Sequence, residues 1–248
     1  LNVSHVWYTG VIRHAGGCND WAKGEAGSPY AIEDYFDVNP YLSDNEESRL
    51  DEFKLLIKRT HAAGMKVVLD FVPNHLARSC SAFFGSADDV SVHWKPENDF
   101  FYYPGEELRL PMETAYREFP AKASGNAFTP CPAETDWYDT VKLNYCDFRT
   151  PTWDKMLEVL RFWCAMGVDA FRCDMVELVP REAIAFLVRE VKKEYPDTQF
   201  IAEVYDRAGY AWYSSVFDAL YDKCGLYDTL FSIVRHNVGA APYDGKEG

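Results

Sequence analysis

The stretch Gly167-Val-Asp-Ala-Phe-Arg-Cys-Asp-Met-Val-Glu-Leu-Val179 says most about this chain. Gly167 is typical of the left-handed residue that ends a helix, and the apolar run that begins at Val168 is bounded like a buried strand. Arg172 and Asp174 come at the end of this run, two positions apart, so an extended backbone points them to the same side. A neighbouring guanidinium keeps a carboxylate ionised, which suits a nucleophile. Taken alone, an Arg-x-Asp pair is more often a structural ion pair.

The composition limits which kinds of protein this chain can be and which kinds of partner it can bind. The chain has 248 residues, of which 48% are hydrophobic, enough for one large core. Its formal net charge of −14 argues against a surface that follows nucleic-acid phosphates. No apolar run approaches the length of a membrane span. The aromatic content of 16% fits neutral carbohydrate partners, because sugar rings stack on aromatic side chains.

Seven scattered cysteines without a CxxC pair argue against a zinc ribbon. Reduced thiols are natural in a cytosol, and this favours a cytoplasmic protein, although a secreted one fits the same count. No signal peptide precedes the first predicted strand, and the chain begins with Leu1 rather than Met, so we expect a trimmed N-terminus. The sequence leaves the compartment undetermined.

Strand-like runs alternate with helical periodicity, which is typical of βα units around a parallel sheet. Residues 10–29 are rich in glycine and predict a loop. Ser43-Asp-Asn-Glu46 has the spacing of a capping box, so a helix that ends near Gly64 should follow. Thr150-Pro151 predicts the start of a second helix, and Pro180 opens a third. Five strands are predicted, at residues 3–9, 66–71, 168–172, 199–204 and 216–221.

A long interruption without helical periodicity spans residues 76–149. A connection of this length is unusual as a structureless loop in a compact domain, so we predict an inserted subdomain. Its many aromatic side chains are expected to form a small core. The alternative for some of them is a sugar-stacking role.

Three successive predicted strands end in carboxylates, at Asp70, Asp174 and Glu203. The carboxyl ends of parallel strands meet at one edge, where barrel enzymes place their chemistry. Glu203 interrupts an apolar run, so burial should raise its pKa, as a general acid needs. Two carboxylates with separated pKa values suit glycoside hydrolysis, and strands about 4.8 Å apart suit the spacing of about 5–5.5 Å in retaining enzymes. The alternatives are that Asp70 and Asn74 cap a turn and that His75 is a satisfied core histidine.

Together these segments resemble the signature regions of the α-amylase family of glycoside hydrolases, which are TIM-barrel enzymes. The first region is matched by Asp70-x-Val72-x-Asn74-His75, the second by residues 167–174, and the third by Ala202-Glu203-Val204. A smaller signature is matched by Lys142-Leu143-Asn144, and Pro29-Tyr30 resembles the loop beside the sugar. The resemblance implies a retaining hydrolase that acts on α-glucosidic bonds of starch-like glucans or maltooligosaccharides through a covalent glycosyl-enzyme intermediate.

The resemblance also implies roles at the reacting bond. Asp174 is the implied nucleophile, and Glu203 is the implied acid/base. Arg172 is implied to orient Asp174, and Asp70 to support Arg172.

Three further residues are implied to bind substrate or metal. Tyr30 is implied to stack beneath the sugar at subsite −1, and His75 to hydrogen-bond that sugar. Asn74 resembles a ligand of the family's structural calcium, the one cofactor that the resemblance implies.

The predicted fold is α/β of the (β/α)8 TIM-barrel type. We expect residues 1–75 to form the first part of the barrel, 76–149 the subdomain inserted after the third barrel strand, and 150–248 the second part. Eight units need about 250 residues before insertions, so we expect only the middle of a barrel. Val6-Trp7-Tyr8-Thr9 resembles the family's second barrel strand, so the resemblance implies that the five strands are about the second to sixth. Such a middle piece has two open parallel edges, so we expect it to self-associate or to belong to a longer chain.

Departures from the family pattern keep other function classes open. Glu177 and Leu178 stand where Lys-His usually ends the second region, and Ser28 replaces a histidine. The fourth signature, a His-Asp pair with a third catalytic carboxylate, has no match, because the only later histidine, His236, precedes Asn237. One alternative is a lyase or racemase barrel with magnesium held by the three strand-end carboxylates. The other is an incomplete or non-catalytic relative that only binds glucan or a partner protein.

Overall fold

A five-stranded parallel sheet organises the computed structural model, which describes residues 2–16, 27–146 and 149–237. Every neighbouring pair of strands is parallel. All five predicted strands occur in this sheet, although most are shorter in the structure than predicted. In spatial order the strands are β1 (His5–Tyr8), β4 (Lys66–Phe71), β9 (Ala170–Cys173), β10 (Gln199–Ala202) and β11 (Ala219–Leu220).

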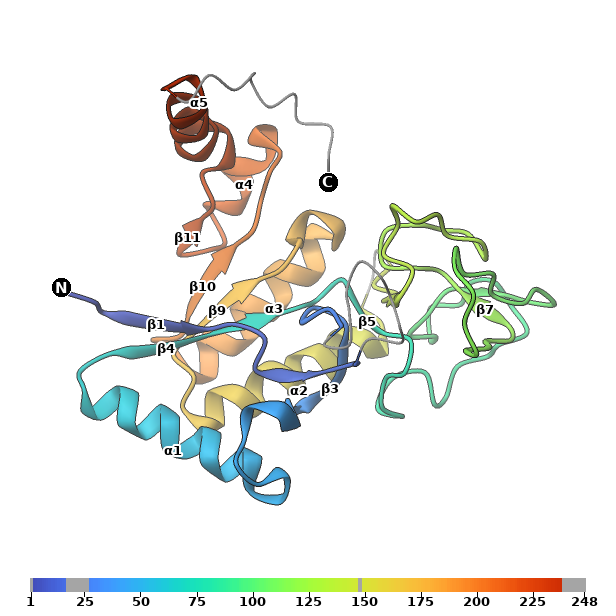
Figure 1. The fold of residues 1–248 in the computed structure, drawn as a ribbon, viewed down its shortest axis with the longest axis horizontal. Helices are drawn as coiled ribbons and strands as arrows, with labels where there is room; N and C mark the ends of the chain where they lie inside the picture. The colour runs from blue at the N-terminus through green and yellow to red at the C-terminus, as the bar shows by residue number, and fades with distance from the viewer. Residues whose placement is uncertain (1, 17–26, 147–148, 238–248) are drawn as a thin grey trace.

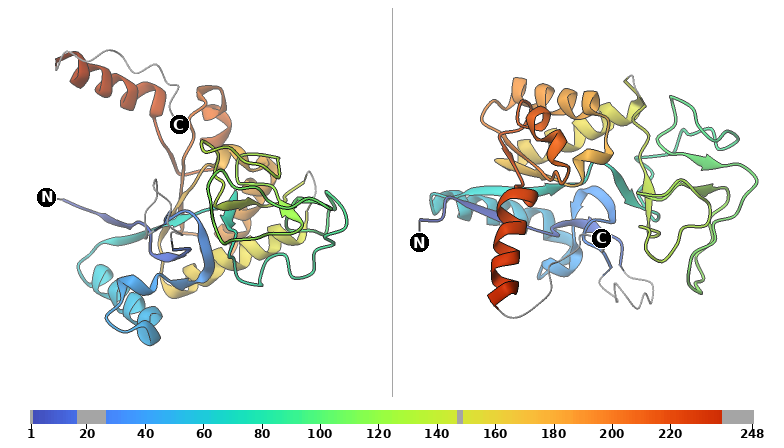
Figure 2. Two further views of the ribbon diagram at one scale, coloured as in Figure 1. Left: turned by 45° about the vertical axis from the view of Figure 1, so that its right-hand side comes forward. Right: turned by 90° about the horizontal axis from the view of Figure 1, so that it is seen from above.

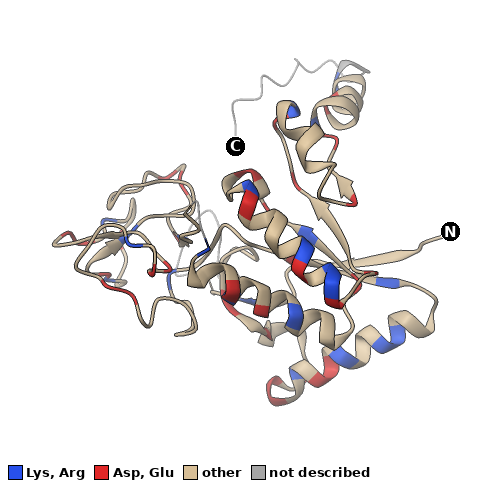
Figure 3. Cartoon of the chain, turned by 180° about the vertical axis from the view of Figure 1, so that it is seen from behind, with Lys and Arg blue, Asp and Glu red and all other residues tan. Residues whose placement is uncertain are grey.

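Three helices pack beside one another on one side of this sheet: α1 (Arg49–Ala62), α2 (Pro151–Met166) and α3 (Arg181–Glu194) (Figure 1). Figure 3 shows them from behind, with the positions of their Lys, Arg, Asp and Glu residues coloured along the ribbons. α2 begins directly after Thr150 and ends at Gly167, whose φ of 107° favours glycine. The apolar face of α2 is buried and includes Met156, Leu160 and Trp163. The sheet and these helices therefore share one core.

The predicted capping box at 43–46 is wrong. Residues 43–45 lie between two short 3-10 turns, η1 (Pro40–Leu42) and η2 (Glu46–Ser48), and α1 begins only at Arg49. The Ser43 hydroxyl donates back to the Pro40 carbonyl, so it is not available to a following helix. The Asn45 side chain caps η2 instead, by accepting from the backbone N–H of Glu47.

The predicted loop at 10–29 is also corrected in part. A short strand, β2 (Ile12–His14), pairs antiparallel with β3 (Ile32–Val38). Three acidic residues interrupt the apolar pattern of β3, which hides it from periodicity alone. Residues 17–26 lie outside the described part of the chain.

The segment after β4 forms small antiparallel sheets beyond the carboxyl ends of the barrel strands (Figure 1). β5 (His75–Ala77) pairs with β8 (Thr140–Lys142), and β6 (Tyr102–Tyr103) pairs with β7 (Ala121–Lys122). No helix occurs in the described residues of 76–149, as predicted. Several of its aromatic side chains form a core, whereas Trp94 is 43% exposed. The buried aromatic residues of this segment are Phe84, Phe100, Tyr102, Tyr138 and Tyr145.

The last described elements continue beyond the sheet. η3 (Val176–Leu178) follows β9, while η4 (Arg207–Gly209) and α4 (Tyr210–Tyr213) follow β10. A π-helical turn, η5 (Lys223–Tyr227), leads into α5 (Asp228–Asn237), which extends away from the sheet (Figure 2). Across 2–16, 27–146 and 149–237, no helix combines the length and hydropathy that a bilayer crossing requires.

Candidate active site

One guanidinium joins three carboxylates at the carboxyl edge of the sheet. Arg172 Nη1 lies 2.7 Å from Asp174 Oδ1 and 3.3 Å from Asp70 Oδ1, and Nη2 lies 2.6 Å from Glu203 Oε1. Asp70 is paired in register with Arg172 across β4 and β9, and Glu203 directly follows β10. All four side chains are buried. The structure thus brings together the four residues that the strand ends predicted.

Aromatic rings surround this guanidinium. The Arg172 guanidinium carbon lies 5.3 Å from the centre of the Tyr30 ring, 5.7 Å from that of Trp7 and 5.6 Å from that of Tyr221. Trp7 Nε1 donates to Asp70 Oδ2 at 3.3 Å, and Arg172 Nε donates to the Tyr221 hydroxyl at 3.1 Å. Tyr30 had been predicted to lie here. Trp7 and Tyr221 had not, although each lies near the end of a predicted strand, where its polar atom can reach the edge.

Two hydrogen bonds fix the Glu203 carboxylate in addition to Arg172. The backbone N–H of Met175 donates to Oε2 at 2.9 Å, and the Tyr205 hydroxyl donates to Oε1 at 2.6 Å. Met175 is the only described non-glycine residue with positive φ, at 43°. Strained backbone of this kind persists where its surroundings require it, and here it aims an N–H at a predicted catalytic carboxylate.

Arg172 lowers the pKa of Asp174, as expected, but burial opposes it. Burial and the adjacent Glu203 carboxylate together raise the pKa of Asp174 to about 7, against the lowering effect of Arg172. One positive charge is shared among three buried carboxylates, so it does not offset the loss of hydration at each. The pKa of Asp174 therefore lies above its ordinary value.

The raised pKa makes stability depend on pH. Between the unfolded value of 3.8 and about 7, the folded protein binds the Asp174 proton more tightly, so its stability falls as pH rises through this window. We expect Asp174→Asn to raise the free energy of unfolding at pH 8 by on the order of 2 kcal/mol, with the gain gone near pH 3. Urea unfolding at both pH values measures this. A variant less stable than the parent at pH 8 would contradict it.

His75 is the first residue of β5 and is buried. Its ring centre lies 5.0 Å from that of Trp137, and Nδ1 lies 3.1 Å from the Asn74 amide nitrogen. The His75 carbonyl also accepts from the Tyr35 hydroxyl at 2.9 Å. His75 is thus held rigidly beside the inserted segment, five positions along the chain from Asp70. Its role toward a sugar stays a prediction.

The surroundings of Asn74 do not fit calcium. Its Oδ1 accepts a hydrogen bond from Lys142 Nζ, and its amide nitrogen donates to the Gly125 carbonyl at 2.9 Å. Burial lowers the pKa of Lys142 to about 8, which leaves the ammonium protonated at pH 6 to 7. Calcium takes six to eight oxygen ligands, several of them carboxylates. Within the described ranges, no group of three or more His, Cys, Asp or Glu side chains is placed to hold a metal ion.

The same test counts against magnesium at the strand ends. A lyase or racemase site needs Asp70, Asp174 and Glu203 to converge on a divalent cation. Here they converge on the Arg172 guanidinium, which occupies the space between them and repels a second cation.

Glu177 is used to hold the loop after β10. Its carboxylate accepts from the backbone N–H of Tyr205 at 2.9 Å and of Asp206 at 2.8 Å. Glu177, which stands where the family usually has lysine, therefore has a structural role here. It fixes the segment from which the Tyr205 hydroxyl reaches the Glu203 carboxylate.

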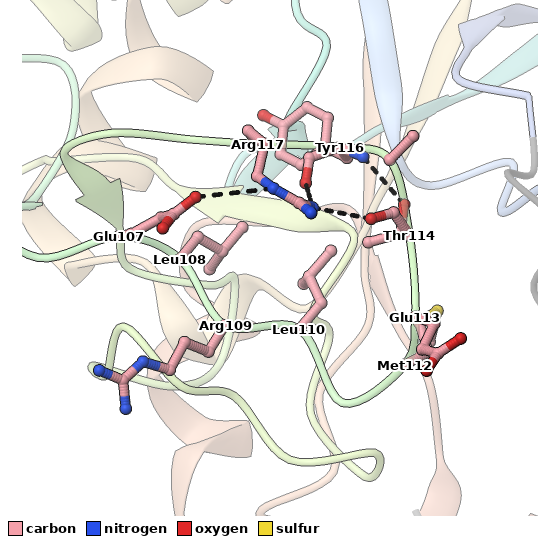
Figure 4. A pocket seen from close by; sticks show the side chains of 10 residues that line it. Glu107, Leu108, Arg109, Leu110, Met112, Glu113, Thr114, Tyr116 and Arg117 are labelled. Atoms are coloured by element: carbon pink, nitrogen blue, oxygen red, sulfur yellow. Dashed lines mark hydrogen bonds and ion pairs between the residues drawn. The ribbon is translucent and has the colours of Figure 1, made fainter.

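Figure 4 shows a separate hollow on the inserted segment, lined by residues 107–110 and 112–117. The Arg117 guanidinium pairs there with the Glu107 carboxylate at 3.7 Å. None of the predicted site residues lines this hollow. One surface loop forms it, without convergent groups from other elements, so it supports no functional assignment.

A family model described as the alpha-amylase catalytic domain matches residues 19–209 of the chain. The chain belongs to the α-amylase family. Among its curated relatives, the alpha-glucosidase of Apis mellifera is 26% identical over 192 residues, covering 71% of this chain and 30% of that protein. Maltase A2 of Drosophila melanogaster is 30% identical over 176 residues, covering 68% of this chain and 28% of that protein.

Solved α-amylase structures share the fold. The α-amylase of Lactobacillus plantarum superposes with a TM-score of 0.62 at 23% identity, over 96% of this chain and 48% of that one. The α-amylase of Geobacillus thermoleovorans, solved with acarbose, gives 0.60 at 21% identity, over 97% and 48%. This chain thus spans about half the length of each of these solved α-amylase chains. The predicted fold class is confirmed as a partial (β/α)8 barrel, and the described strands form no closed barrel.

Proposed function

We propose that this chain carries the nucleophile and the acid/base of a retaining glycosidase for α-glucosidic bonds. One observation carries the proposal: Arg172 holds the Asp174 and Glu203 carboxylates together at the ends of adjacent parallel strands. Membership of the α-amylase family supports the same reaction class.

The residues suggest a two-step reaction. An Asp174 carboxylate oxygen attacks the anomeric carbon while the glycosidic bond breaks, and Glu203 gives its proton to the departing oxygen. Water then attacks the same carbon, Glu203 takes one of its protons, and the bond to Asp174 breaks. Two inversions at one carbon retain its configuration. Arg172 orients both carboxylates, and Asp70 holds Arg172 from β4.

Starch-like glucans or maltooligosaccharides are the proposed substrates. The relatives include proteins named alpha-glucosidase and maltase, which supports an α-glucoside. The Tyr30 ring beside Arg172 offers an apolar face for a sugar at the site of attack, and His75 supplies a ring nitrogen nearby along the chain. Both roles follow the family resemblance.

Trapping the covalent intermediate tests the proposal. Incubation with 5-fluoro-α-glucosyl fluoride should add one fluoroglucosyl group to the peptide that contains Asp174, as read by mass spectrometry. Addition of EDTA should change nothing. Label on another carboxylate would overturn the assignment, and maltotriose binding without any label would favour a non-catalytic, glucan-binding relative.

Tyr205 provides a finer test, because its hydroxyl reaches the reaction only through Glu203. Loss of a hydrogen bond to a charged group costs about 1.5–3 kcal/mol, so Tyr205→Phe should lower kcat/KM for maltotriose by about tenfold or more. Glucosyl fluoride needs little protonation and should be affected less. Tyr41→Phe is the control, since Tyr41 is 83% exposed. Equal losses on both substrates would remove Tyr205 from this role.

A further inference from the structure

A partly buried lysine ammonium joins three segments next to the candidate site. Lys142, at the end of β8, extends Nζ to Asn74 Oδ1 in the loop after β4, and it donates to the Leu178 carbonyl at 2.8 Å. Leu178 belongs to η3, which follows the strand that carries Arg172. The inserted segment, the first barrel part and the second barrel part therefore meet at one positive charge.

The oxygens around this ammonium are neutral. Asn74 contributes an amide oxygen and Leu178 a backbone carbonyl, and no carboxylate in the described ranges pairs with Lys142. A single charge with three N–H donors suits neutral oxygens at hydrogen-bond distance. A divalent ion needs more ligands and negative ones. The donor set therefore matches the lysine and not the calcium that the family resemblance implies.

The position of Lys142 is built into the sheet. Its backbone pairs in register with His75 across β5 and β8, so the side chain starts beside the Asn74–His75 peptide. The other end of the Asn74 amide donates to the Gly125 carbonyl at 2.9 Å. Both ends of that amide are thereby engaged, and its oxygen is not available to a second cation while Lys142 is charged.

We propose that Lys142 is an internal cation that takes the place of a structural metal ion at this junction. It ties the inserted segment to both barrel parts, and the junction is stable without calcium. This proposal does not depend on the proposed reaction, because it concerns binding and stability alone.

Calcium binding by the metal-stripped full chain is the direct test. Isothermal titration with CaCl2 at pH 6.5 should give no saturable heat up to about 1 mM calcium, and melting temperatures in EDTA and in calcium should agree within about 1 °C. One calcium bound per chain with Kd below about 100 µM, together with a raised melting temperature, would overturn the proposal.

Two substitutions locate the effect. Lys142→Met keeps most of the volume but leaves the buried Asn74 amide oxygen and the Leu178 carbonyl without their donor, so it should lower the melting temperature by on the order of 5–10 °C, which calcium should not restore. Lys95→Met is the matched control in the same segment, since Lys95 is exposed and pairs only at 3.7 Å with Asp89. An unchanged melting temperature for Lys142→Met would contradict the proposal that Lys142 stabilises this junction. If this variant fails to fold, the calcium titration of the parent still decides.

Discussion

Asp174→Asn is expected to reduce turnover of maltooligosaccharides by roughly 10⁴-fold or more in the complete enzyme, while substrate binding changes little. An amide cannot form the glycosyl ester, so the first step loses its nucleophile. The isosteric amide keeps an oxygen toward Arg172, and the rings of Tyr30 and Trp7 stay in place, so the sugar contacts survive. Initial rates and equilibrium binding of maltotriose measure the two effects separately.

The matched control for this substitution is Asp51→Asn, an exposed aspartate on α1 that should leave both quantities unchanged. Proton NMR of the first product formed by the parent enzyme must show retained configuration. An inverted product, or an Asp174→Asn variant that keeps more than about one tenth of the parent rate, would rule out the nucleophile assignment.

Glu203→Gln should separate substrates by leaving group. For maltotriose, whose leaving oxygen needs a proton, we expect kcat/KM to fall by about 10³–10⁴-fold. For α-glucosyl fluoride the fall should be about tenfold or less, because fluoride departs with little protonation. kcat/KM is the correct quantity, since it reports the first irreversible step and is not limited by the second step, which also needs Glu203 as a base.

Small anions add a second readout for Glu203→Gln. Azide needs no general base, so it should accelerate turnover of the variant and produce α-glucosyl azide with retained configuration. Glu182→Gln on the exposed side of α3 is the control and should show neither effect. Equal losses on both substrates without azide rescue would remove Glu203 from the acid/base role.

Local sequence determined the framework of this protein. Apolar runs such as 66–71 match a buried strand because both faces of a central parallel strand are covered. Thr150-Pro151 and Gly167 mark the ends of α2 because the backbone preferences of proline and glycine act locally. The positions of Asp70, Asp174 and Glu203 followed from these strands, since parallel strands end at a common edge. The roles assigned to them by resemblance stay predictions until the substitutions above are made.

Only the tertiary structure decided how those residues share charge and which partners they have. Arg172 is divided among three carboxylates, so Asp174 is protonated more readily than its sequence neighbour suggested. Trp7 joins the site from β1, Tyr221 joins it from the position directly after β11, and Lys142 reaches Asn74 across 68 positions of the chain. Burial sets the pKa values of these side chains, and contacts between distant segments decide which side-chain oxygens are already hydrogen-bonded. Neither burial nor these contacts can be read from the spacing of residues along one strand.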